Sequence, residues 1–202
     1  MLTLSLLLIS LVSADDMCRA LALSGGGAMG AYEAGALWGL YYALENKTDM
    51  TYDVVTGVSA GSINMGGVAL FDKGDEEELV KFLSFAWQNL TSDDVYKNWW
   101  PLSVVQGVMF HSGIFNNQPL TDYLTELMLP KLPFKRKYMI SAVDINTGSY
   151  HVFNESSNTD YVKQVISSAS IPFVFPHQHW PKEHLVLMDG GTVWNTNMVS
   201  AI

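Results

Sequence analysis

The chain has 202 residues, of which 49% are hydrophobic and 15% are charged, so it carries enough apolar side chains for one well-packed domain. Eleven Lys and Arg stand against twenty Asp and Glu, which gives a formal net charge of -9, and no segment gathers basic residues into a patch. The composition therefore argues against nucleic acid as a partner and against attraction to an anionic membrane by charge.

The N-terminus resembles a secretory leader. Residues 2–12 form an apolar run, and the small residues Ser13 and Ala14 follow it. The run resembles a signal peptide and is too short to span a membrane, which takes about 20 apolar residues; the alternative is a buried strand or helix. We expect a leader over residues 1–14, one domain over residues 15–202, and a secreted or lumenal (endomembrane or vacuolar) glycoprotein. Three N-glycosylation acceptor tripeptides agree with this route, and they begin at Asn46, Asn89 and Asn154.

Two units of strand, turn and helix open the domain. An apolar run over 18–23 predicts a strand, which passes through a glycine-rich loop into a helix expected over 28–44. A second, β-branched run over 52–58 predicts another strand, and a helix is expected over 62–71. Cys18 begins the first strand, and because it is the single cysteine, we expect a buried and inert thiol.

The rest of the chain continues this alternation. Its patterning predicts three helices, over 76–90, 119–129 and 160–169, and three strands, over 137–143, 149–153 and 185–188. Residues 96–110 show no clean period, so we expect a long excursion there. Strands that alternate with helices predict an α/β domain, of three layers α/β/α, with a mainly parallel central sheet. Functional groups of such a domain gather at the carboxyl ends of the strands.

The strongest motif lies where the second strand turns into its helix. Gly57-Val58-Ser59-Ala60-Gly61 is a Gly-X-Ser-X-Gly sequence in the setting of a nucleophile elbow, a sharp turn that exposes a serine hydroxyl beside a helix N-terminus. Gly57 and Gly61 would let the strand and the helix approach closely. The alternative is a turn that merely caps the helix. The motif makes Ser59 the candidate nucleophile.

The glycine-rich loop supplies candidate oxyanion donors. Gly25, Gly26 and Gly27 precede the first helix, and their unhindered N–H groups could stabilise the negative charge that develops in acyl transfer. Together with Gly30 they also satisfy the Gly-X-Gly-X-X-Gly dinucleotide fingerprint. That alternative needs an acid at the end of the second strand, and the nearby acids come before it or at its start. A P-loop is excluded because its lysine is missing.

A candidate base ends the last strand. Asp189 precedes Gly190 and Gly191, two residues that let the backbone crowd a site. A carboxylate within hydrogen-bond reach of a hydroxyl accepts its proton as the new bond forms, so Asp189 could activate Ser59. The alternative is an ordinary turn aspartate.

These motifs, in this order, resemble the patatin-like phospholipases, and the resemblance covers about residues 18–202. The segments that carry it are 23–35, 57–62, 168–172, 175–176 and 189–191. The resemblance implies a phospholipase A-like lipid acyl hydrolase in lipid degradation, with Ser59 as nucleophile, Asp189 as base and the three loop glycines as oxyanion hole. It implies a lipid ester substrate, met at a membrane or micelle surface, and no catalytic histidine, metal or other cofactor.

Two features depart from the family pattern. Met29 stands where many members carry Arg or Lys, so any assistance from that charge to the oxyanion or to a lipid head group is missing. The chain also ends at Ile202, soon after the aspartate motif, whereas family domains continue through further helices. We therefore expect the domain to be incomplete at its C-terminus.

Two other functions stay open. A Ser-His-Asp α/β-hydrolase esterase needs an acid and then a histidine after the serine. Asp144 meets that order with one of three histidines, His177, His179 or His184. These histidines come before the strand that ends in Asp189, which favours loop positions for them. A catalytically weak lipid-binding protein of the same fold is the other candidate, with residues 99–110 covering the ligand. For that segment we favour ordinary core over an interfacial lid.

Overall fold

The computed structural model describes residues 18–157 and 160–202. The leader expected over residues 1–14 lies outside this range. The expectation of a buried Cys18 thiol is wrong, because the side chain is exposed. The physical reason is its place: the first strand, β1 (Ala20–Leu23), begins only two residues later.

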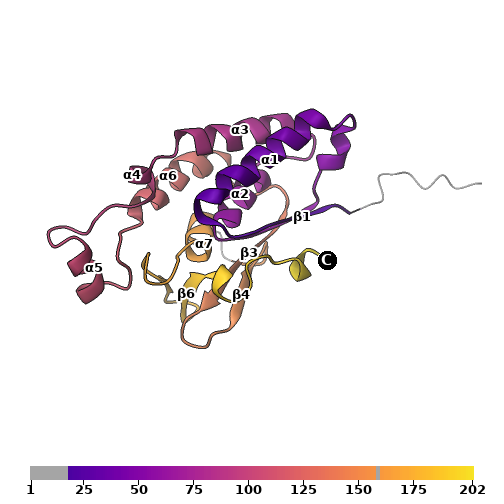
Figure 1. Ribbon diagram of the computed structural model, residues 1–202. Coiled ribbons are helices and arrows are strands. Elements are labelled where there is room, and N and C mark those ends of the chain that lie inside the picture. The colour runs from indigo at the N-terminus through magenta and orange to yellow at the C-terminus, as the bar shows by residue number, and fades with distance from the viewer. Residues whose placement is uncertain (1–17, 158–159) are drawn as a thin grey trace, which may run out of the picture.

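A mixed, six-stranded sheet forms the centre of the molecule (Figure 1). The other strands are β2 (Val54–Val58), β3 (Lys137–Asp144), β4 (Tyr150–Phe153), β5 (Gln178–Trp180) and β6 (Leu185–Asp189). The pairs β1·β2 and β2·β3 are parallel, β3 pairs antiparallel with β4 and with β6, and β5 pairs antiparallel with β6. Most strands, namely β1, β2, β3 and β5, therefore point one way. The expected α/β class with a mainly parallel sheet is confirmed.

Two strands meet end to end along one edge of β3. Val58 of β2 pairs with Ser141, and Asp189 of β6 pairs with the next residue, Ala142. β4 pairs with β3 over residues 140–143 and so occupies the other edge. Because a strand has only two edges, β2 and β6 share one of them and run toward each other. Their carboxyl ends, and the residues that follow, are therefore brought together.

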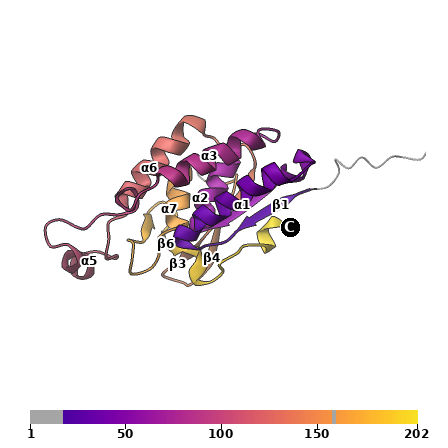
Figure 2. The same ribbon diagram turned by 45° about the horizontal axis from the view of Figure 1, so that its top comes forward.

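Helices cover one face of this sheet (Figures 1 and 2). Two of them touch the strands: α2 (Ala60–Ala69) packs on β1, β2 and β3, and α7 (Tyr161–Ser168) packs on β3, β5 and β6. Three further helices complete the layer, namely α1 (Gly30–Ala43), α3 (Glu76–Asn89) and α6 (Gln118–Met128). The core lies between the strands and these helices, where Val55, Met65 and Ile140 are fully buried.

The C-terminal segment lies against the opposite face of the sheet. It contains two short helical turns, η5 (Gly190–Thr192) and η6 (Val199–Ala201), which contact β3 and the pair β1 and β2, respectively. The Thr56 hydroxyl donates to the Asn197 carbonyl at 2.8 Å, and the Asn197 side-chain amide donates to the Ser141 hydroxyl at 2.9 Å. The C-terminal segment thus covers part of the second face of the sheet, which is consistent with the α/β/α class.

The expected excursion is present, but its expected burial is wrong. Beyond α4 (Ser92–Val95), the chain leaves the body and returns, with α5 (Val104–Phe110) at the far end (Figure 1). Val108, Met109 and Phe110 are each 67% exposed, so residues 99–110 are not ordinary core. The physical reason is that no second layer of the described chain packs over α5. Within the described ranges, no helix has the length and apolar character that crossing a bilayer demands.

Candidate active site

Ser59 occupies a sharp turn between β2 and α2. Its backbone has φ 55° and ψ -126°, a region that non-glycine residues rarely adopt and that costs about 1–3 kcal/mol. The flanking glycines allow the turn: a Cβ on Gly57 would lie 2.4 Å from the Gly61 carbonyl oxygen, and one on Gly61 would lie 2.5 Å from the Leu23 carbonyl oxygen. The turn therefore has the geometry of the nucleophile elbow that the motif predicts.

The end of α7 holds both candidate residues by hydrogen bonds. The Ser59 N–H donates to the Ser168 hydroxyl oxygen at 2.9 Å, and that hydroxyl donates to the Ser141 carbonyl at 2.6 Å. The Asp189 N–H donates to the Ser170 carbonyl at 2.9 Å. In the sequence, residues 168–172 contribute only to the family resemblance, and no local pattern predicts a role for them. The structure makes this segment the element that fixes the elbow relative to β3 and β6.

Asp189 lies at the carboxyl end of β6 and is 5% exposed. Burial raises the pKa of its carboxyl group above the ordinary value of 3.8, although hydrogen bonds from the Ser59 hydroxyl and the Gly191 N–H act in the opposite direction. The Gly191 bond is 2.7 Å long. A Cβ on Gly190 would lie 2.4 Å from the Ser141 carbonyl oxygen, so only glycine lets β6 end this close to β3. A carboxylate with a raised pKa is a stronger base toward a hydroxyl.

The glycine-rich loop differs in part from its expected role. The Gly25 N–H already donates to the Asn195 carbonyl at 3.0 Å, and the Asn195 side-chain amide donates back to the Gly25 carbonyl at 3.0 Å. The Gly25 N–H is therefore engaged and not free for an oxyanion. Among residues 18–157 and 160–202, the N–H groups of Gly26 and Gly27 have no acceptor. The N–H of Ala60, which begins α2, is free of an intrahelical partner as well and was not predicted as a donor.

A chain of polar contacts joins the glycine-rich loop to three helices. The Ser24 N–H donates to one carboxylate oxygen of Glu33 at 3.0 Å, and the side-chain amide of Asn64 donates to the other, also at 3.0 Å. The indole N–H of Trp87 donates to the Asn64 amide oxygen at 2.6 Å. A Cβ on Gly30 would lie 2.5 Å from the Trp87 ring, which explains the last glycine of the loop motif. No local pattern in the sequence indicates this network.

An apolar cavity of about 460 Å³ opens beside Ser59. Its lining is drawn from α1, α2, α3, α4, α6 and residues 169–175. Gly27, Ser59 and Ala60 all belong to this lining, so the candidate nucleophile and two of the candidate N–H donors face the same space. The volume falls within the range typical of small-molecule sites.

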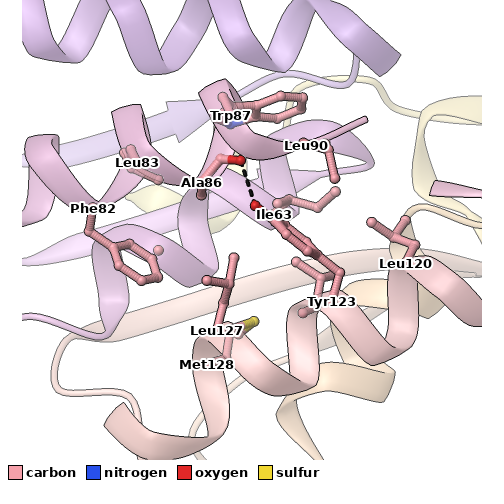
Figure 3. A pocket seen from close by; sticks show the side chains of 12 residues that line it. Ile63, Phe82, Leu83, Ala86, Trp87, Leu90, Leu120, Tyr123, Leu127 and Met128 are labelled. Carbon is pink, nitrogen blue, oxygen red and sulfur yellow. Dashed lines mark hydrogen bonds between the residues drawn. The ribbon is translucent and has the colours of Figure 1, made fainter. Parts of the chain in front are cut away.

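A second, small cavity of about 30 Å³ lies between α3 and α6 (Figure 3). It shares Ile63, Trp87, Leu90 and Leu120 with the larger cavity. The Tyr123 hydroxyl donates to the Ala86 carbonyl at 2.6 Å and so joins α6 to α3 beside this space. The two cavities therefore adjoin each other along these four side chains.

The histidines of the rival triad lie elsewhere. His177 and His179 line a different cavity, where their ring centroids are 4.9 Å apart, and burial lowers the pKa of His177. Asp144 is engaged in the turn after β3, since its carboxylate accepts from the Thr147 hydroxyl at 2.7 Å. His184 is exposed. In the part of the chain that the structure describes, no histidine lines the cavity beside Ser59, and no three His, Cys, Asp or Glu side chains form a metal-binding group.

Comparison with known proteins assigns this chain to a family. The family model of the patatin-like phospholipases matches residues 21–202. A relative from Escherichia coli (strain TW11681), the cGAMP-activated phospholipase, is 26% identical over 204 residues, which cover 91% of this chain and 55% of the relative. The crystal structure of VipD from Legionella pneumophila matches with a TM-score of 0.58 at 13% identity, over 89% of this chain and 46% of that one, and so shows a shared fold. The chain thus spans about half the length of these two proteins. The match of the family model across nearly the whole chain shows that this protein belongs to the patatin-like phospholipase family.

Proposed function

We propose that the protein hydrolyses fatty-acyl esters of lipids through a Ser59 acyl-enzyme, with Asp189 as the base. One observation carries the proposal: β2 and β6 meet end to end along one edge of β3, which brings together Ser59, at the wall of an apolar cavity, and the buried carboxyl group of Asp189. Membership of the family, and a relative named as a phospholipase, support lipid esters as substrates.

The proposed reaction has two halves that mirror each other. Ser59 Oγ attacks the ester carbonyl carbon while the Asp189 carboxylate takes the hydroxyl proton, which gives a tetrahedral oxyanion. The oxyanion collapses, the ester C–O bond breaks, and Asp189 returns the proton to the departing alcohol. Water then attacks the acyl-enzyme and gives its proton to Asp189. The second tetrahedral intermediate collapses, the bond between Ser59 Oγ and the acyl carbon breaks, and Asp189 returns that proton to Ser59 Oγ as the fatty acid leaves.

The oxyanion needs N–H donors that are not engaged elsewhere. Gly26, Gly27 and Ala60 meet that condition, whereas the Gly25 N–H is held by Asn195 and serves to position the loop. Each such donor contributes about 2.7–4 kcal/mol of transition-state stabilisation in comparable sites. The positive partial charge at the N-terminus of α2 acts in the same direction.

The deciding experiment measures ester hydrolysis by the wild type and three variants. Ser59→Ala and Asp189→Asn are expected to lose activity, whereas an alanine triple variant at His177, His179 and His184 is expected to keep it. Loss of activity in the histidine variant alone would overturn the dyad. If the wild type binds fatty acid or phospholipid vesicles and releases no acid from a p-nitrophenyl ester, the lipid-binding alternative holds instead.

We also propose that the protein follows the secretory route. Asn46 and Asn89 are exposed, which supports them as glycan acceptors. Expression in a eukaryotic cell should give a mature chain that begins at Asp15 and loses mass on treatment with an N-glycosidase. An N-terminus that still begins at Met1, with no mass change, would contradict the proposal.

A further inference from the structure

The segment that carries α5 is apolar and uncharged to an unusual degree. We call residues 98–115 the apolar arm. No Asp, Glu, Lys or Arg occurs between Lys97 and Asp122. Seven large apolar side chains of the arm are exposed, namely Trp100, Leu102, Val104, Val105, Val108, Met109 and Phe110, and Trp100 reaches 87% exposure. Exposed apolar groups gathered in this way typically mark an interaction surface.

The apolar arm is held in a defined shape. The Trp99 indole N–H donates to the Gly113 carbonyl at 3.0 Å, and the Trp99 ring stacks on His111 with centroids 3.6 Å apart. A Cβ on Gly107 would lie 2.5 Å from the Ile114 carbonyl oxygen, so α5 packs closely on the segment of the arm that returns to the body. These contacts bury one side of the arm and leave its apolar side chains outward.

The base of the arm is joined to the rim of the Ser59 cavity. The Ile114 N–H donates to the Phe173 carbonyl at 2.8 Å, and the Phe115 N–H donates to the Val174 carbonyl at 3.0 Å. Val174 lines the cavity. Phe173 itself is 83% exposed and has φ 66°, a conformation that is unfavourable for a bulky residue. The exposed Phe173 therefore lies at the base of the arm, next to the cavity rim.

We propose that the apolar arm and Phe173 dock the protein on an uncharged lipid surface, such as a phosphatidylcholine bilayer, and so hold the Ser59 cavity against it. This inference rests on the proposed function, because a lipid aggregate is then the place where the substrate lies. Aromatic and aliphatic side chains enter the boundary between head groups and acyl chains by burying apolar area. The uncharged arm and the net charge of -9 make zwitterionic lipid the complementary surface and anionic lipid an unfavourable one.

The test uses the whole chain and vesicles of phosphatidylcholine. The arm variant combines Trp100→Ser, Met109→Ser and Phe110→Ser. A matched control combines Trp38→Ser, Leu40→Ser and Tyr42→Ser on α1, whose side chains are 45%, 46% and 48% exposed. Cosedimentation is measured in a Ser59→Ala background, so that the lipid is not consumed. We expect the arm variant to bind at least about tenfold more weakly and the control to bind as the parent does. Higher ionic strength should not weaken binding, because screening acts on charges.

Activity separates this inference from the proposed function. The arm variant should cleave a soluble short-chain ester as the wild type does and should lose activity on vesicle lipid. If the wild type cleaves no ester at all, the proposed function fails while the vesicle result still stands. The docking surface is overturned if the parent does not bind phosphatidylcholine, if the arm variant binds as tightly as the parent, if binding requires anionic lipid, or if the arm instead supports a dimer on size exclusion.

Discussion

Ser59 and Asp189 both occupy positions that disfavour the folded state. Ser59 has a backbone conformation that glycine would adopt without strain, and Asp189 carries a carboxyl group whose ionised form is disfavoured by burial. Strain and buried charge at one point of a well-packed sheet are common where a reaction takes place. Both residues can therefore be tested through stability as well as through activity.

Replacing Ser59 by glycine should raise the free energy of unfolding. Relief of the strained conformation contributes about 1–3 kcal/mol, and the greater freedom of glycine in the unfolded chain offsets about 0.5–1 kcal/mol of this. Thermal unfolding of Ser59→Gly and Ser59→Ala checks the effect, since both variants lack the hydroxyl and only glycine relieves the backbone. A lower melting temperature for Ser59→Gly than for Ser59→Ala would contradict the proposed backbone strain at Ser59.

Replacing Asp189 by asparagine should stabilise the protein at neutral pH. The folded-state pKa of Asp189 is raised above 3.8, so its stabilising contribution is present below the unfolded pKa and is lost as pH rises through the folded pKa. The stability advantage of Asp189→Asn should therefore shrink as the pH falls from 7 toward about 4. Melting temperatures of both proteins across this range provide the measurement. In the same range, wild-type hydrolysis should decline as the base becomes protonated.

The residues that the sequence predicts are those with local motifs. Ser59 lies between Gly57 and Gly61, and Asp189 is followed directly by Gly190 and Gly191, so glycines in the local sequence mark both positions. Ser168 and Asn195 have no such pattern, because their partners lie 109 and 170 residues away along the chain. The engagement of the Gly25 N–H was missed for the same reason. Hydrogen-bond partners that distant become visible only when the fold brings the segments together.

At the scale of elements, periodicity predicted most helices and strands to within a few residues. β5 was missed because three residues are too few to show alternation. α5 was missed because its residues are apolar on every side, and such a composition fits core and exposed surface alike. Whether an apolar helix is covered depends on a partner layer, which a local sequence does not reveal.

The two adjoining cavities between α2, α3 and α6 should set the preferred acyl length. Ile63 lines both cavities, so the larger side chain of Ile63→Phe should reduce the space in them. We expect kcat/KM for a long-chain ester to fall about tenfold relative to a short-chain ester. Ile63→Val is the matched control and should keep the ratio close to that of the wild type. An unchanged ratio in Ile63→Phe would place the acyl chain elsewhere.

At the scale of the whole molecule, a buried ion pair ties the helical layer to the sheet. The Arg136 guanidinium, just before β3, donates to Glu76 at the start of α3 at 2.9 Å, and the two side chains are 1% and 5% exposed. The same guanidinium donates to three backbone carbonyls, those of Tyr52, Phe71 and Asp72. One side chain thus joins the turn after α2, the segment before β2 and the first residues of β3.

Removing one partner of this pair should destabilise the fold strongly. Arg136→Met leaves the Glu76 carboxylate buried and unpaired, which costs about 3–5 kcal/mol. The control is Lys81→Met, which removes an exposed pair with Glu77 and should change stability by about 0–1 kcal/mol. Denaturant unfolding measures both. A double variant, Arg136→Met with Glu76→Met, should regain part of the lost free energy of unfolding. Equal losses of this free energy in Arg136→Met, the double variant and the Lys81→Met control would contradict the role of the ion pair.

Because β2 and β6 meet on β3, we expect the candidate site to tolerate changes in the length of some segments and not of others. The nucleophile and the base belong to distant parts of the chain, yet their separation is set by two consecutive residues, Ser141 and Ala142. Insertions in the long connections between them, the apolar arm included, leave that spacing untouched. One extra residue within β3 at this point would move the two strand ends apart and reverse which side chains face the helices. Variation in length should therefore accumulate in the loops, while β3 keeps its length across proteins that retain the activity.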